Sequence, residues 1–148
     1  MGLFSNATAK KESGTLTLSP AEAFTAVLTT AMAADGYATD EELRILRDNL
    51  FSLLLFLPLV EVARLHMLER VLKLLESPGP EALLVGARSV LEADLRETAF
   101  AMAADMVTSD GELAEEEKSY LDRLRDTLDV NEEMAGLLIT AMAIKNRG

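Results

Sequence analysis

The sequence contains no cysteine among its 148 residues. Disulfide bonds, catalysis by a thiolate and sulfur-ligated metal sites are therefore excluded together. A chain without disulfides suits a reducing compartment, so we expect a cytoplasmic protein. A chain of this length can bury most of its apolar surface in one core without covalent cross-links, and a single domain is predicted.

Basic residues are also scarce. Lysine and arginine together number 14 against 25 aspartates and glutamates, which makes the formal net charge −11 at pH 7. Nucleic acids and anionic membranes bind clustered basic side chains, so neither is an expected partner. The most apolar run, residues 53–60, is far shorter than the roughly 20 residues of a membrane-spanning helix. We interpret it as core and expect no direct membrane insertion.

Side chains suited to catalysis are few. His66 is the only histidine, and Ala63 stands where the Glu of a Glu-x-x-His metal motif would be. Serine and threonine residues therefore lack a histidine base, and no glycine-rich phosphate loop occurs. His66 lies near Glu69, Arg70 and Lys73 in the sequence, which favours a surface position. We predict that the protein is not an enzyme.

The residues that are present predict an all-α protein. Ser19, Pro20 and Glu22 form a capping box with proline at the first helical position. No segment alternates apolar and polar residues over the length of a strand. Apolar residues at helical spacing predict one compact bundle of about seven helices, at residues 20–35, 40–57, 60–76, 80–91, 95–105, 112–128 and 132–144.

Two further predictions concern the organisation of this bundle. Residues 1–17 mix small, polar and charged types without periodicity, so we expect a mobile N-terminal tail before a helical domain at 18–148. The segment 60–76 is apolar over a wide arc, which predicts a central helix. On the later segment 112–128, Tyr120, Leu121, Leu124 and Leu128 share one apolar face.

An acidic helix-turn-helix pattern occurs twice. Each copy has an apolar helix end, an Asp-Gly pair and a carboxylate-rich helix start, and an Asp precedes a Glu by seven residues in both, as Asp35/Glu42 and Asp110/Glu117. The structural interpretation is that carboxylates in the first turn of a helix oppose its dipole, for about 0.3–1 kcal/mol each. That interpretation explains each copy singly, but not why the chain contains two.

The functional interpretation is a cation site. If the helices that carry the two motifs pack side by side, the carboxylates of both could face each other. Two such charges about 6 Å apart would repel by roughly 3 kcal/mol at an effective dielectric constant of 20, and a divalent cation would relieve this repulsion. Oxygen ligands favour Ca²⁺ or Mg²⁺ over Zn²⁺. Asp105 is either a hydrogen-bonded core carboxylate or an additional ligand.

At these residues the sequence resembles the TerB-like family of bacterial tellurite-resistance proteins, whose fold is shared with the N-terminal domain of the DjlA co-chaperones. The resemblance rests on residues 34–42 and 109–117, each in an Asp-Gly-x-x-x-x-x-Glu frame, and residues 95–101 and 144–148 look like a cyanobacterial-type branch. It covers about residues 18–148. It implies a bundle of about seven helices with both motifs brought together, and Asp35, Glu42, Asp110 and Glu117 as metal ligands.

Two hypotheses on function follow. The first, which the resemblance implies, is a non-enzymatic module that binds a divalent cation and docks to another protein in the response to tellurite or general stress. A membrane-associated stress-response complex is one candidate partner. The alternative is a metal-free helical scaffold whose acidic helix ends and an apolar groove dock a basic partner protein.

Overall fold

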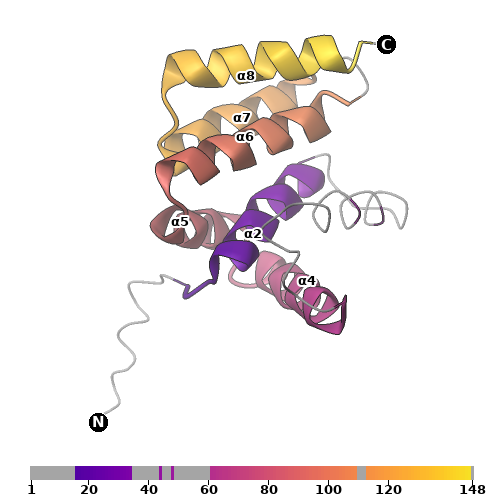
Figure 1. Ribbon diagram of the computed structural model, residues 1–148, viewed down its shortest axis with the longest axis vertical. Helices are drawn as coiled ribbons and strands as arrows, with labels where there is room; N and C mark the ends of the chain where they lie inside the picture. The colour runs from indigo at the N-terminus through magenta and orange to yellow at the C-terminus, as the bar shows by residue number, and fades with distance from the viewer. Residues whose placement is uncertain (1–15, 35–43, 45–47, 49–60, 110–112, 148) are drawn as a thin grey trace.

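The computed structural model describes residues 16–34, 44, 48, 61–109 and 113–147, and these residues form a compact all-helical bundle (Figure 1). Six helices and no strand occur within these ranges: α2 (Pro20–Ala33), α4 (Glu61–Glu76), α5 (Pro80–Val90), α6 (Ala93–Val107), α7 (Glu115–Leu128) and α8 (Glu132–Lys145). The all-α class and six of the seven predicted helices are confirmed. Of the helix predicted at 40–57 only Arg44 and Asp48 are described, both of them helical, and the apolar run 53–60 lies outside the described residues.

The local signals behave as expected at the helix ends. The Ser19 hydroxyl accepts a hydrogen bond from the Glu22 amide at 3.1 Å, and the Ser19 amide donates to the Glu22 carboxylate at 2.9 Å, which completes the capping box before α2. α4 ends before the Ser-Pro-Gly-Pro segment. There Gly79 has a φ of +120°, a backbone conformation that favours glycine, and Pro80 begins α5.

The helices pack in two groups, which are joined where α6 packs against α2 and where α7 packs against α5. α2 packs against α4, α5 and α6, while α6 also packs against α7 and α8. In Figure 1, α6, α7 and α8 lie together at the top, and α8 is the outermost helix of that group, on the far side of α6 from α2. α8 therefore has a described helix packed on one side only.

The central helix is α2, and the prediction that residues 60–76 would be central is wrong. Every α2 residue from Ala23 to Met32 is buried, whereas α4 buries only Met67, Leu68 and Val71. The physical reason is that α2 packs against α4, α5 and α6 and also contacts Tyr120 of α7, whereas α4 packs mainly against α2 and α5 among the described helices. A wide apolar arc on α4 does not by itself decide how many neighbours surround that helix.

Threonines allow α2 to be buried all round. The hydroxyl of Thr25 donates to the Ala21 carbonyl at 2.8 Å, and that of Thr29 donates to the Ala26 carbonyl at 3.0 Å. These bonds satisfy the hydroxyls within the helix, so their burial leaves no unpaired polar group. A threonine in such a helix therefore behaves as an apolar residue, which the polar character of its side chain conceals in the sequence.

The N-terminal part of the described chain leads directly into the core. Residues 1–15 of the predicted tail lie outside the described residues, so the structure describes only its last two positions, 16 and 17. Leu18 is buried, and a Cβ atom added to Gly86 of α5 would lie 3.3 Å from the Leu16 carbonyl oxygen and 3.3 Å from Leu18 Cδ1. Glycine at position 86 thus permits this close approach. Within the described ranges, no helix is long and apolar enough to cross a membrane.

Candidate functional site

Of the four predicted metal ligands, the structure describes Glu117; Asp35, Glu42 and Asp110 lie outside the described residues. Glu117 is buried in the first turn of α7, and its Oε1 accepts a hydrogen bond from the Ala114 amide at 2.9 Å. This is one half of a capping box. The other half is missing because Ala114 has no side-chain acceptor, although its backbone has the extended conformation of an N-cap residue.

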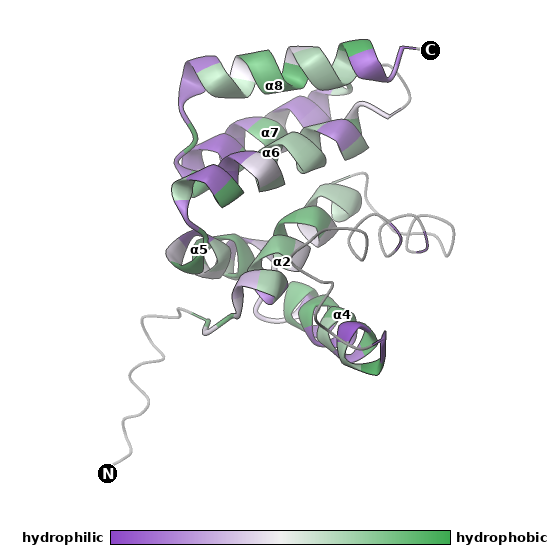
Figure 2. Cartoon of the chain, in the orientation of Figure 1, coloured by the Kyte–Doolittle hydropathy of each residue, from purple (hydrophilic) through white to green (hydrophobic). Residues whose placement is uncertain are grey.

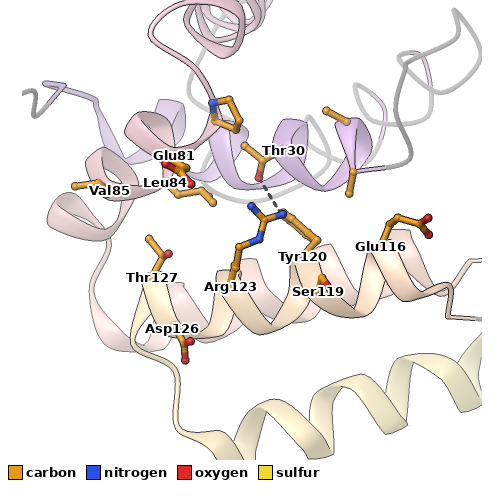
Figure 3. A pocket seen from close by; sticks show the side chains of 13 residues that line it. Thr30, Glu81, Leu84, Val85, Glu116, Ser119, Tyr120, Arg123, Asp126 and Thr127 are labelled. Atoms are coloured by element: carbon orange, nitrogen blue, oxygen red, sulfur yellow. Dashed lines mark hydrogen bonds between the residues drawn. The ribbon is translucent and has the colours of Figure 1, made fainter.

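A tyrosine joins the helices that flank the two acidic motifs. The hydroxyl of Tyr120 in α7 forms a 2.8 Å hydrogen bond with the Thr30 hydroxyl of α2 (Figure 3). It also donates to the Val27 carbonyl at 3.1 Å, so Thr30 is the donor in the bond between the two hydroxyls. Thr30 belongs to the last turn of α2, which precedes the first motif. Tyr120 lies one turn after Glu117, at the end of the second. The C-terminal end of α2 therefore lies beside the N-terminal part of α7.

A pocket of about 650 Å³ lies where α2, α5 and α7 meet. Ala33 and Ala34 line it from the end of α2 and Glu116 from the first turn of α7, so both flanks of the acidic motifs border one depression. Figure 3 shows its labelled side chains around the Tyr120–Thr30 pair. The full lining is Thr30, Ala33, Ala34, Pro80, Glu81, Leu84, Val85, Glu116, Ser119, Tyr120, Arg123, Asp126 and Thr127.

The pocket combines apolar surface with carboxylates. Leu84 and Val85 of α5 contribute apolar surface, and Val85 is half exposed. Glu81 and Glu116 make no ion pair or side-chain hydrogen bond with other described residues. Such carboxylates can accept hydrogen bonds from ammonium or guanidinium groups of a ligand.

Burial sets the protonation of the central hydroxyl. Burial raises the pKa of Tyr120 above its ordinary range, and the hydrogen bond with Thr30 offsets only part of this rise. The phenol therefore stays protonated at neutral pH and can donate its proton to the Val27 carbonyl. In this arrangement Tyr120 joins α2 to α7 and is held far from the pKa that a general base at neutral pH requires.

The remaining candidate residues lie elsewhere. His66 is exposed on α4, as predicted, beside a pocket of about 350 Å³ that Glu69, Arg70 and Lys73 also line. In the described part of the chain, no group of three or more histidine, aspartate or glutamate residues is placed to hold a metal ion. Three of the four proposed ligands lie outside that part of the chain.

Asp105 is a hydrogen-bonded carboxylate at the C-terminal end of α6. Its side chain is 31% exposed, and its Oδ1 accepts from Lys145 Nζ at 3.1 Å and from Asn146 Nδ2 at 2.8 Å. Asn146 also donates to the Thr108 hydroxyl at 3.2 Å. Asp105 thus holds the end of α8 against α6. It is less buried than the core carboxylate that the sequence suggested.

The sequence interpretation missed the link between Thr30 and Tyr120. It placed Tyr120 correctly on the buried face of α7, among leucines. The available signal was that a buried phenol needs a hydrogen-bond partner. The sequence could not identify Thr30 as that partner, because the two residues are 90 positions apart.

The chain matches no protein-family model, and comparisons with curated proteins and with solved structures give no match. The resemblance to the TerB-like family therefore stays a prediction carried by the two acidic motifs.

Proposed function

We propose that this protein is a non-catalytic helical module that binds a divalent cation between its two acidic motifs and docks to another protein in the response to tellurite or general stress. The observation that carries the proposal is the hydrogen bond between Tyr120 and Thr30. It holds the end of α2 beside the start of α7. Asp35 follows Ala34 directly in the chain, and Glu117 follows Glu116, while Ala34 and Glu116 line the same pocket.

The electrostatics of these flanks favour a cation. The C-terminal end of α2 carries the negative end of a helix dipole, and the first turn of α7 holds three consecutive glutamates, Glu115, Glu116 and Glu117. The first motif would add Asp35 and Glu42. Oxygen ligands of this kind suit Ca²⁺ or Mg²⁺. The assignment to the response to tellurite or general stress rests on the family resemblance.

Calorimetric titration of the metal-free protein with Ca²⁺, Mg²⁺ and Mn²⁺ tests the cation proposal. We expect saturable binding of at least one of these ions and its loss in the double variant Asp35→Asn/Asp110→Asn. The matched control is Asp122→Asn/Glu76→Gln, which removes two exposed carboxylates elsewhere and should bind as the unmodified protein does. If none of the three ions gives measurable binding heat, at protein concentrations able to detect millimolar affinity, the proposal is contradicted.

A second candidate function is a metal-free scaffold that docks a basic partner. The composition of the α2/α5/α7 pocket favours it, because apolar surface from Leu84 and Val85 lies beside Glu81 and Glu116. A basic amphipathic helix could place apolar residues against Leu84 and Val85, and its lysines or arginines against the two glutamates. The net charge of −11 would increase the rate of encounter with such a partner.

A labelled model helix of leucine and lysine residues provides a direct probe of this pocket. We expect binding by fluorescence anisotropy in the presence of EDTA, and a dissociation constant raised about tenfold or more by Glu81→Lys/Glu116→Lys. The matched control, Glu61→Lys/Glu76→Lys, makes the same charge change on α4 and should have a smaller effect. Equal weakening by both pairs would show that only the net charge matters and would exclude the pocket.

A further inference from the structure

The outer face of α8 is apolar although no described helix covers it. Leu137 and Ile144 lie two turns apart and are 62% and 53% exposed. Thr140 and Ala141 between them are exposed as well, and no charged residue occurs from Met134 to Ile144. Figure 2 shows this hydrophobic middle section of α8 between hydrophilic ends. A surface helix of a monomer normally has a polar outer face.

The inner face of the same helix already has its neighbour. Ala135 is buried, and Met134, Leu138, Ile139 and Met142 pack against the core on the side of α6. The outer residues therefore form a second apolar stripe, in the three-four spacing that helix pairs use. The space beside Gly136 is open as well, because a Cβ atom added there would meet nothing within 4 Å.

The charges at the two ends of α8 are balanced and opposite. Glu132 and Glu133 lie in the first turn, and Lys145 and Arg147 lie at the C-terminal end, all of them exposed. These two acidic and two basic residues cancel, so residues 131–147 carry no net charge in a strongly acidic chain. Lys145 also pairs with Asp105 of α6, which leaves Arg147 as the basic residue available to a partner. An antiparallel copy of the same helix would place each acidic end against a basic end and would oppose the two helix dipoles favourably.

We propose that the outer face of α8 is a self-association surface, on which two copies of the protein pair their α8 helices in antiparallel orientation about a two-fold axis near Thr140. Leu137 of one copy then packs against Ile144 of the other. Glu133 faces Arg147 at both ends, as a two-fold symmetric interface requires. At about 0.15 M salt the Debye length is about 8 Å, so the repulsion between exposed negative charges of the two copies that are farther apart than this is largely screened.

The size of this surface sets the expected affinity. α8 has 14 residues, and one pair of such helices buries less than the roughly 1,200–2,000 Å² of a standard interface. We therefore expect a weak dimer that dissociates on dilution, with a dissociation constant on the order of 10–100 μM.

Sedimentation equilibrium of the full chain, from about 5 μM to 1 mM, measures this association. We expect a monomer-dimer equilibrium and a dissociation constant raised about tenfold or more by Leu137→Glu or by Ile144→Glu, because each variant buries an unpaired carboxylate at the contact. The control is Val62→Glu, which makes the same kind of change at a residue of similar exposure, 61%, on α4. Circular dichroism melts verify that each variant is folded.

Charge reversal at the ends tests the antiparallel orientation. Glu133→Arg alone and Arg147→Glu alone should each weaken association, because like charges then meet at both ends. A mixture of the two single variants should associate again, since each arginine then faces a glutamate of the other chain, and the double variant Glu133→Arg/Arg147→Glu should also recover. Recovery of association in these two cases distinguishes a specific antiparallel helix pair from nonspecific association through an apolar surface.

The proposal is overturned if the protein stays monomeric up to 1 mM, which is also the result expected if a different protein covers this face. A dimer that Leu137→Glu and Ile144→Glu leave unchanged would use another surface. A dimer that fails to recover in the mixture would not be antiparallel. Each of these results contradicts the arrangement proposed here.

Discussion

Replacing Phe100 with alanine is expected to lower the free energy of unfolding by about 3–5 kcal/mol. Phe100 is fully buried in α6, the helix that packs against α2, α7 and α8. Truncation of the ring removes its transfer free energy and leaves a cavity that α6 cannot close, because neighbouring helices on several sides hold it in place. Domains of this size are typically stable by about 5–15 kcal/mol, so the variant would lose a large share of its stability.

Urea denaturation at a few micromolar protein, followed by circular dichroism, measures this loss below the concentration at which the proposed dimer forms. The control is Val62→Ala on α4, a truncation at a residue that is 61% exposed, for which we expect a change of about 0.5 kcal/mol or less. Similar losses for both variants would mean that the ring of Phe100 does not contribute the core packing that its burial implies.

The second large effect is a loss of stability at alkaline pH that depends on Tyr120. Because burial raises the pKa of Tyr120 in the folded protein, the unfolded chain releases the phenolic proton first, near pH 10. The folded state then binds more protons than the unfolded state, so stability falls as pH rises. The stabilisation is complete below pH 10, and above it we expect a loss of up to about 1.4 kcal/mol per pH unit.

Comparison with Tyr120→Phe isolates this contribution from the titration of lysines and of Tyr37. At pH 7 the variant should be less stable by about 1–2 kcal/mol, since it loses the bonds of the phenol to Thr30 and to the Val27 carbonyl, while the Thr30 hydroxyl can turn its proton to that carbonyl, 2.7 Å away. The difference between the two proteins should disappear near pH 11. A difference that stays constant from pH 7 to pH 11 would refute the coupling of Tyr120 ionisation to unfolding.

Local chemistry made the helices predictable. The capping box of Ser19 and Glu22 and the prolines around Gly79 act between neighbouring residues, so the sequence states them directly. The burial of α2 was not predictable in this way. It depends on how many other helices surround α2 and on threonine hydroxyls that bond within their own helix.

For the candidate site, too, the sequence predicted the local features and not the contacts between distant segments. The sequence identified two acidic motifs, but it could not show that the helices flanking them meet. That depends on Tyr120 and Thr30, which are 90 positions apart. The motif residues Asp35, Glu42 and Asp110 lie outside the described residues, so their role as ligands stays a proposal. The pocket residues Glu81 and Val85 were not predicted, because α5 carries no motif that distinguishes them.

By itself the sequence determined the all-α class, most helix boundaries and the acidic character of this protein, because capping, helical spacing and charge are properties of residues close together in the chain. Only the tertiary structure decided which helix is central, how α2 and α7 are joined and which face of α8 stays exposed. These features arise from contacts between distant segments, and many packings of the same amphipathic helices satisfy the same local preferences.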